Sequence, residues 1–330
     1  MNFRLETPAA VLKAREAQRG WNWILEVLVF GAVFFTVSIA ESLVMIPGIA
    51  IAIAANPAVL SAAMSGDAAL AEEAMLAAMN SDGVTICMLF ANLAMIGVVM
   101  LLCRALQKRR MNTLGFVKRN MGKEYLKGLG FGFLLFSAAV LICVLTGALK
   151  IEGISAGFTP GIFLLFVLGF LIQGMAEEVL CRGYFLVSYA RRHSMWAAVL
   201  ANAVLFAMLH LGNTGISPLA FINLTLFGVF ASVYFVKSGN IWGVGALHSI
   251  WNLAQGNFYG IRVSGIVTEC SVFASTSVEG RGLINGGAFG LEGGLAVTIV
   301  LLAGTLFLLW RYPAVRSRVE AAADQAAQEA

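Results

Sequence analysis

The sequence predicts an all-α protein, a polytopic membrane helix bundle of about eight transmembrane helices. Of its 330 residues, 59% are hydrophobic and 12% are charged, and the mean hydropathy is +0.84. Soluble domains are about 25% charged, so this chain needs lipid as part of its solvent. The apolar residues also come in runs of about the length that a helix needs to cross a bilayer. These runs follow one another closely, so we expect one membrane domain.

Eight runs are candidates for transmembrane helices. We expect the first to stop around Pro47, and we expect the short fifth run and the short, polar seventh run to be surrounded by protein. The predicted spans lie near residues 22–47, 84–103, 128–149, 161–188, 195–211, 217–236, 241–258 and 290–310.

The segments outside these spans complete the domain organisation. Residues 1–20 form an N-terminal segment, 21–311 the membrane domain and 312–330 a polar tail. Within the membrane domain, the acidic, alanine-rich connection 56–82 is expected to form a surface helix, and the glycine-rich connection 259–289 an irregular loop.

Basic residues indicate the orientation. If the chain crosses the bilayer eight times, nearly all lysines and arginines fall on the side of the two termini, and the other side receives Lys150, Arg262 and Arg281. The positive-inside rule then predicts a multi-pass protein of the cell membrane with both termini in the cytoplasm. No basic surface with interleaved aromatic residues is evident, so we expect no nucleic-acid partner.

The cysteines indicate no disulfide framework. There is no CxxC motif, and most of the cysteines fall within or at the ends of apolar runs, where a cysteine behaves as a small packing residue. They are Cys87, Cys103, Cys143, Cys181 and Cys270.

Polar side chains inside the predicted spans are few, and in lipid such groups are functional candidates. The first span has Glu26 and Glu41, each near an end, and Asn202 and Asn223 are interpreted as packing residues. The remaining candidates lie on three spans: Glu177, Glu178 and Arg182 on the fourth, Phe206 and His210 on the fifth, and His248 and Asn252 on the seventh.

Helical spacing groups these candidates. Glu178 and Arg182 are four residues apart and can pair on one face of a helix. Glu177 lies roughly 100° around the same helix, so it can face the bundle interior. At about 1.5 Å of rise per residue, the polar groups of the three spans reach overlapping depths, which favours a cluster.

Such a cluster suits peptide hydrolysis, although other interpretations stay open. A carboxylate in a low-dielectric cavity is a candidate general base for water, and histidine and Asn252 are candidates to stabilise an oxyanion. Glu178 and Arg182 are equally compatible with a plain ion pair, His210 with a helix-end residue at the outer interface, and Asn252 with interhelical packing.

Two other functional classes fit the same residues less well. A zinc site could draw on Glu177, Glu178, His210 and His248, but the HExxH signature is missing. A proton-coupled transporter could use a carboxylate and histidine relay, but no broken helices recur in matching halves.

The three motifs together resemble a known family. Glu177-Glu178-x-x-x-Arg182, Phe206-x-x-x-His210 and His248-x-x-x-Asn252 follow in that order on membrane spans. This pattern is similar to the CAAX-protease and bacteriocin-processing (CPBP or ABI) family, which includes the type II CAAX prenyl endopeptidases. The resemblance covers the motif-bearing core, about 120–260, and the stretch Asn285–Gly290 with Glu292 looks like a glycine-rich element of some bacterial members.

The resemblance implies an intramembrane endopeptidase. Glu177 would be the base, Glu178 its partner and His210 the residue that positions water, and His248 with Asn252 would form the oxyanion site. Arg182 and Phe206 would support this arrangement. We expect no cofactor, with a zinc-dependent protease as the alternative.

The expected partner is a peptide or membrane-protein substrate in the bilayer of a prokaryotic cell. The second hypothesis is a non-catalytic membrane scaffold or bacteriocin immunity protein.

Overall fold

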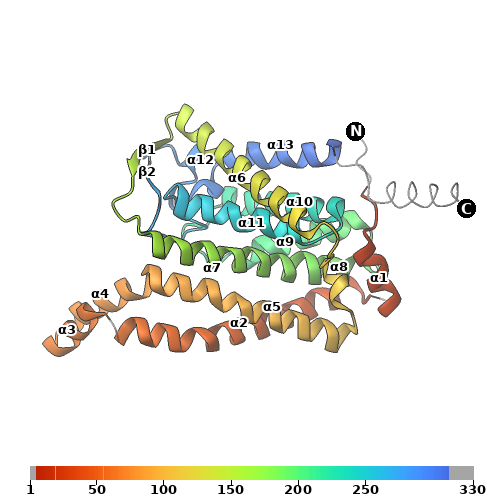
Figure 1. Ribbon diagram of the computed structural model, residues 1–330, viewed down its shortest axis with the longest axis horizontal. Helices are drawn as coiled ribbons and strands as arrows, with labels where there is room; N and C mark the ends of the chain where they lie inside the picture. Colours follow the sequence, from red (N-terminus) through yellow and green to blue (C-terminus); the bar gives the residue numbers. More distant parts are fainter. Residues whose placement is uncertain (1–4, 19, 55, 312–330) are drawn as a thin grey trace, which may run out of the picture.

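The fold is a bundle of long apolar helices (Figure 1). The computed structural model describes residues 5–18, 20–54 and 56–311, so the tail 312–330 lies outside the described residues. Each of the eight predicted spans coincides with a helix, which confirms the all-α polytopic bundle. These helices are α2 (Trp23–Ala54), α5 (Asp82–Gln107), α6 (Met121–Leu145), α7 (Pro160–Glu178), α9 (Met195–Leu209), α10 (Pro218–Ser238), α11 (Trp242–Leu253) and α13 (Leu295–Arg311).

Five segments of the described chain are long and apolar enough to cross a membrane. They are Trp23–Ile51, Asp82–Gln107, Met121–Leu145, Pro160–Ala190 and Pro218–Ser238. Helices α9 and α13 are shorter, and α11 has 12 residues, nearly all of them buried. Protein therefore surrounds α11, as expected for the short seventh span.

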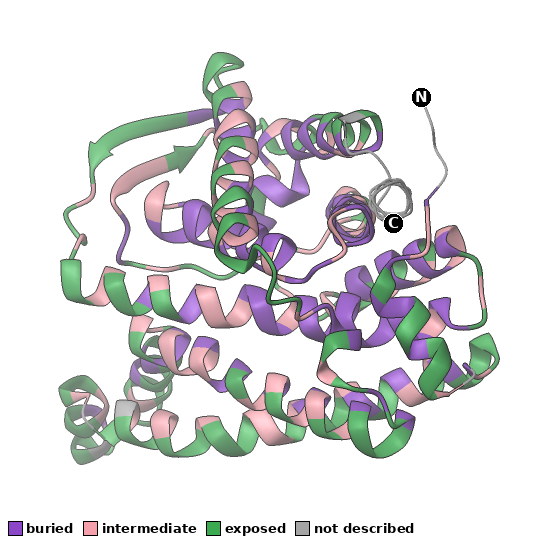
Figure 2. Cartoon of the chain, turned by 45° about the vertical axis from the view of Figure 1, so that its right-hand side comes forward, coloured by how far each residue is buried: buried purple, intermediate pink, exposed green. Residues whose placement is uncertain are grey.

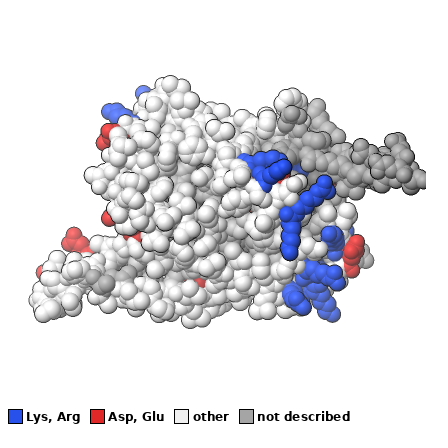
Figure 3. All heavy atoms as spheres, in the orientation of Figure 1, with Lys and Arg blue, Asp and Glu red and all other residues white. Residues whose placement is uncertain are grey.

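The surface fits a membrane environment. On the face shown in Figure 3, most lysine and arginine gather at one end of the molecule near α1 (Ala9–Ala17), and several acidic residues lie at the opposite end near α3 (Pro57–Ser65) and α4 (Ala68–Met79). A broad belt with few charged residues lies between the two ends. Exposed large apolar side chains, which lipid would cover, are most numerous on α2, α6 and α13. These features support a membrane protein.

Two predicted boundaries are wrong. Helix α2 continues through Pro47 to Ala54. Ending the helix in lipid would leave several backbone groups without partners, whereas a proline within it frees one carbonyl that neighbouring groups can bond. The connection 56–82 forms two helices, α3 (Pro57–Ser65) and α4 (Ala68–Met79). Gly66 separates them with a left-handed φ of 71°, and Asp67 caps the second.

A small sheet was not predicted. Strands β1 (Leu149–Ile154) and β2 (Phe273–Ser277) pair antiparallel, with a bulge between Ile151 and Gly153. The expected irregular loop 259–289 therefore contains β2, together with the short helix α12 (Gly282–Asn285). The third span is also displaced, because α6 ends at Leu145 and the chain then turns into β1.

Helix α7 lies at the centre of the bundle. It continues through a π-helical segment, Val179–Leu186, into α8 (Val187–Ala190). Buried residues gather on the helices around it, whereas α2 to α5 show mainly exposed and intermediate positions (Figure 2). Gly174 lets α7 approach α11, since a Cβ there would lie 2.6 Å from Ser249 Oγ. The two helices that carry most of the candidate residues are thus in direct contact.

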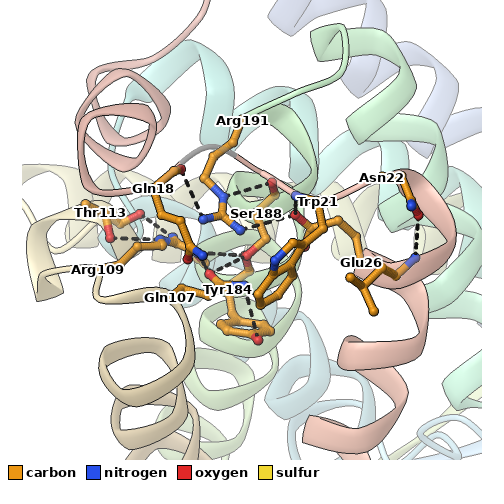
Figure 4. A network of polar contacts seen from close by, with 12 residues as sticks. Gln18, Trp21, Asn22, Glu26, Gln107, Arg109, Thr113, Tyr184, Ser188 and Arg191 are labelled. Carbon is orange, nitrogen blue, oxygen red and sulfur yellow. Dashed lines mark hydrogen bonds and ion pairs between the residues drawn. The ribbon is translucent and has the colours of Figure 1, made fainter.

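A buried polar network stabilises the π-helical segment Val179–Leu186 and α8, which follow α7 (Figure 4). A π-helical turn disturbs the regular bonding of the backbone, and Arg109 donates to the Gly183 carbonyl at 2.9 Å and the Tyr184 carbonyl at 3.2 Å. Burial lowers the pKa of Arg109 to about 10, so its guanidinium remains protonated at neutral pH. Arg191 pairs with Glu26 at 3.2 Å and ties α2 to the same region. These two arginines, which the orientation argument counts as basic residues, therefore have structural roles.

Candidate active site

The candidate residues of three helices converge on one cavity. It has a volume of about 260 Å³, and its lining includes Glu177 of α7, His210 at the end of α9, and His248 and Asn252 of α11. Glu178 and Arg182 are absent from the lining and are buried beside it. The structure therefore separates the two adjacent glutamates, one at the cavity and one behind it.

Glu178 is held by charge-assisted hydrogen bonds. Its Oε1 accepts from Arg182 at 2.7 Å, and both side chains are 0% exposed. The guanidinium of Arg182 also lies 4.6 Å from the ring centre of Phe206. Buried charged groups are costly unless paired, so the ion pair with Glu178 and the contact with the Phe206 ring hold the Arg182 side chain in place.

His248 lies between the two glutamates. Its Nδ1 is 2.8 Å from Glu178 Oε1, and its Nε2 is 3.8 Å from Glu177 Oε2. Because a carboxylate accepts, Nδ1 carries a proton and donates it to Glu178. In the neutral imidazole Nε2 is then an acceptor, and it becomes a donor only when the ring is protonated.

Glu177 keeps contact with the cavity. Its side chain is 21% exposed, and its Oε1 accepts a hydrogen bond from Gln173 Nε2. Gln173 in turn accepts from Asn252 Nδ2 at 2.9 Å, so one glutamine connects α7 to α11. Sequence reasoning did not identify Gln173. Its position four residues before Glu177, on the same helical face, is the signal that points to it.

His210 ends α9 at the edge of the cavity. Its Nδ1 is 2.8 Å from the Phe206 carbonyl oxygen and donates to it, which leaves Nε2 as the free ring nitrogen. The Phe206 ring packs against His210 at 4.7 Å and His248 at 5.9 Å between ring centres. Phe206 thus contacts both histidines and Arg182.

Comparison with known families addresses this same part of the chain. A family model described as type II CAAX prenyl endopeptidase Rce1-like matches residues 159–254. These residues form an Rce1-like domain. The match runs from the residue before α7 to the residue after α11, and it includes all three motifs. The predicted resemblance is therefore confirmed.

The match to this family supports the assignment of the protein as a CAAX-type intramembrane endopeptidase, a peptidase with a protein substrate in a lipid bilayer. No curated protein and no solved structure matches the chain.

Among the described residues, no three histidine, cysteine, aspartate or glutamate side chains are grouped so that they could hold a metal ion. Glu178 Oε1 accepts hydrogen bonds from Arg182 and from His248 Nδ1, so both of these atoms already have hydrogen-bond partners.

The glycine-rich element beyond the domain also reaches the cavity. Glu292 lines it and accepts from Ser264 through the backbone N–H at 3.0 Å and the hydroxyl at 2.6 Å. Gly286 and Gly290 have φ values of 77° and 92°, which only glycine adopts readily. This tight backbone brings Glu292 to the cavity edge.

The two asparagines interpreted as packing residues make interhelical bonds. Asn202 Nδ2 donates to Ser232 Oγ at 2.9 Å, which joins α9 to α10. Asn223 donates to the carbonyl of Glu292 at 2.8 Å and to that of Gly294 at 2.9 Å. Asn223 therefore anchors the glycine-rich element to α10.

Proposed function

We propose that this protein is an intramembrane endopeptidase that hydrolyses a peptide bond with water activated by Glu177. The observation that carries the proposal is the asymmetry of the glutamates: Glu177 opens to the cavity, while Glu178 is enclosed with Arg182. A base must reach its proton, and of the two adjacent glutamates only Glu177 lines the cavity.

In the first step, Glu177 removes a proton from water as the water oxygen attacks the peptide carbonyl carbon. The carbonyl π electrons move to oxygen and form a tetrahedral oxyanion. His210 positions the water, because its Nδ1 is committed to the Phe206 carbonyl and its Nε2 is free to accept a hydrogen bond.

Asn252 and His248 stabilise the oxyanion. The Asn252 amide uses one N–H for Gln173 and has a second to donate. His248 donates through Nε2 in its protonated form, in which Glu178 on the opposite side of the ring balances the charge. Glu177 then delivers its proton to the leaving nitrogen as the C–N bond breaks, which yields a carboxylic acid and an amine.

The membrane proteome tests this function directly. In cells that carry Glu177→Gln, we expect one or more uncleaved precursors to accumulate, while the variant remains at the wild-type level in the membrane. Glu72→Gln, at an exposed position on α4, is the matched control and should leave precursor levels unchanged. A non-catalytic scaffold predicts no difference between Glu177→Gln and wild type.

Chelation distinguishes the glutamate mechanism from the zinc-dependent alternative. We propose that the purified protein needs no cofactor, so cleavage should persist after treatment with EDTA. Stoichiometric zinc together with loss of cleavage on chelation, restored by added zinc, would contradict this mechanism.

A further inference from the structure

The outer wall of the cavity comes from helices outside the Rce1-like domain. Helix α2 contributes Phe34 and Glu41, which are seven residues apart and therefore lie on one helical face. Helix α5 contributes a stripe of residues whose helical spacing also places them on one face. The stripe consists of Thr85, Met88, Leu89, Asn92 and Met95. A substrate in the cavity would lie between the catalytic groups and this wall.

Glu41 is the wall's only acidic residue among the described lining residues, and it lacks a partner. Its Oε1 is buried without any hydrogen bond from the described residues. The other acid outside the domain, Glu292, accepts from Ser264. A buried polar atom is normally paired, so an unpaired one needs an explanation. The mechanism proposed for Glu177 does not use Glu41.

The charges around the cavity indicate what would pair with it. The described lining has three carboxylates, those of Glu41, Glu177 and Glu292, and no lysine or arginine. An anionic substrate group would be repelled by these carboxylates, whereas a cationic group would be attracted to them and would donate a hydrogen bond to the Glu41 carboxylate.

We propose that Glu41 is a specificity-determining residue that binds a lysine or arginine side chain of the substrate close to the scissile bond. The inference rests on the proposed endopeptidase function. It gives the N-terminal helices the role of selecting the substrate, while the Rce1-like domain carries out the chemistry.

A peptide library tests the proposal. Full-length protein in proteoliposomes is incubated with apolar peptides in which Lys, Arg, Gln, Glu or Ala occupies each position in turn, and mass spectrometry locates the cleaved bonds. We expect wild type to favour peptides with Lys or Arg near the cleaved bond over the matched Gln peptides. Glu41→Gln should reduce that ratio of kcat/KM about tenfold or more, the scale of one hydrogen bond to a charged group.

Two further variants complete the design. Glu41→Lys should reverse the preference toward Glu peptides, an outcome that a purely structural role for Glu41 would not produce. Glu72→Gln on the exposed face of α4 should leave the wild-type preference unchanged.

The outcomes separate this inference from the proposed function. Cleavage by wild type without a basic preference, or a preference that Glu41→Gln leaves intact, would overturn the role of Glu41 and leave the endopeptidase standing. If wild type cleaves no peptide, or Glu177→Gln cleaves as well as wild type, the endopeptidase proposal fails and the substrate preference fails with it.

Discussion

At the scale of single residues, two adjacent glutamates have different environments. Glu178 accepts from both Arg182 and His248, while Glu177 faces the cavity with Gln173 as its hydrogen-bond donor. The spacing of the sequence was sufficient to predict the partner of Glu178, because Arg182 lies one helical turn away. It was insufficient to predict that His248 would lie between the two glutamates, since that contact depends on how closely α7 and α11 approach.

The buried ion pair predicts a large cost when one partner is removed. Arg182→Met leaves Glu178 as an unpaired buried charge, and we expect a loss of stability of roughly 3–5 kcal/mol. The double variant Glu178→Gln/Arg182→Met should recover part of that loss, because no charge is then left unpaired. Apparent melting temperatures in detergent measure both effects. Equal destabilisation in the single and double variants would contradict this explanation.

Gln173 lines the cavity and bonds to both Glu177 and Asn252, which gives it a positioning role for these two side chains. Gln173→Ala frees both side chains, and we expect kcat to fall about 10-fold to 100-fold, the scale typical when a supporting hydrogen bond is lost. KM should change little, and Gln173→Glu should fail to restore activity because it places a second acceptor against Glu177. Steady-state kinetics in proteoliposomes measure kcat and KM for each variant. A change confined to KM would argue against positioning.

At the scale of elements, the contacts between helices explain why some parts of the site could be predicted from the sequence and others could not. Spans and motif spacing follow from composition and helical periodicity, so the sequence was enough to place all five candidate catalytic residues on their helices. The contribution of α2 and α5 to the cavity wall was not predictable, because Phe34 and Glu41 match no motif. The β1–β2 pair was also missed, since its strands are short and far apart in the chain.

The approach of α7 to α11 predicts the effect of a small substitution. Gly174→Ala places a methyl group against the backbone of Ser249, 2.7 Å from its Cα, so the helices must separate. We expect a cost of roughly 1–3 kcal/mol and a fall in turnover, because Glu177 and His248 move apart. Gly161→Ala on the same helix is the matched control, since its Cβ would meet nothing within 4 Å. Thermal stability and cleavage rate should change only in the first variant.

At the scale of the whole molecule, the charge distribution supports a membrane protein with two unlike ends. The predicted orientation, with both termini in the cytoplasm, follows from the positive-inside rule. A protease site inserted at Gly66, between α3 and α4, should then be cleaved when protease is added outside intact cells. A site in the connection between α5 and α6 should be cleaved only after lysis. The reverse pattern would invert the orientation.

The central claim is that Glu177 is the base and Glu178 its buried support. The most direct test compares turnover and apparent melting temperature for Glu177→Gln and Glu178→Gln in purified, reconstituted protein. We predict that Glu177→Gln reduces cleavage by at least 10²-fold, the lower range for loss of a general base, with little change in melting temperature. Glu178→Gln should lower both. Glu177→Gln that retains wild-type turnover would contradict the assignment of the base.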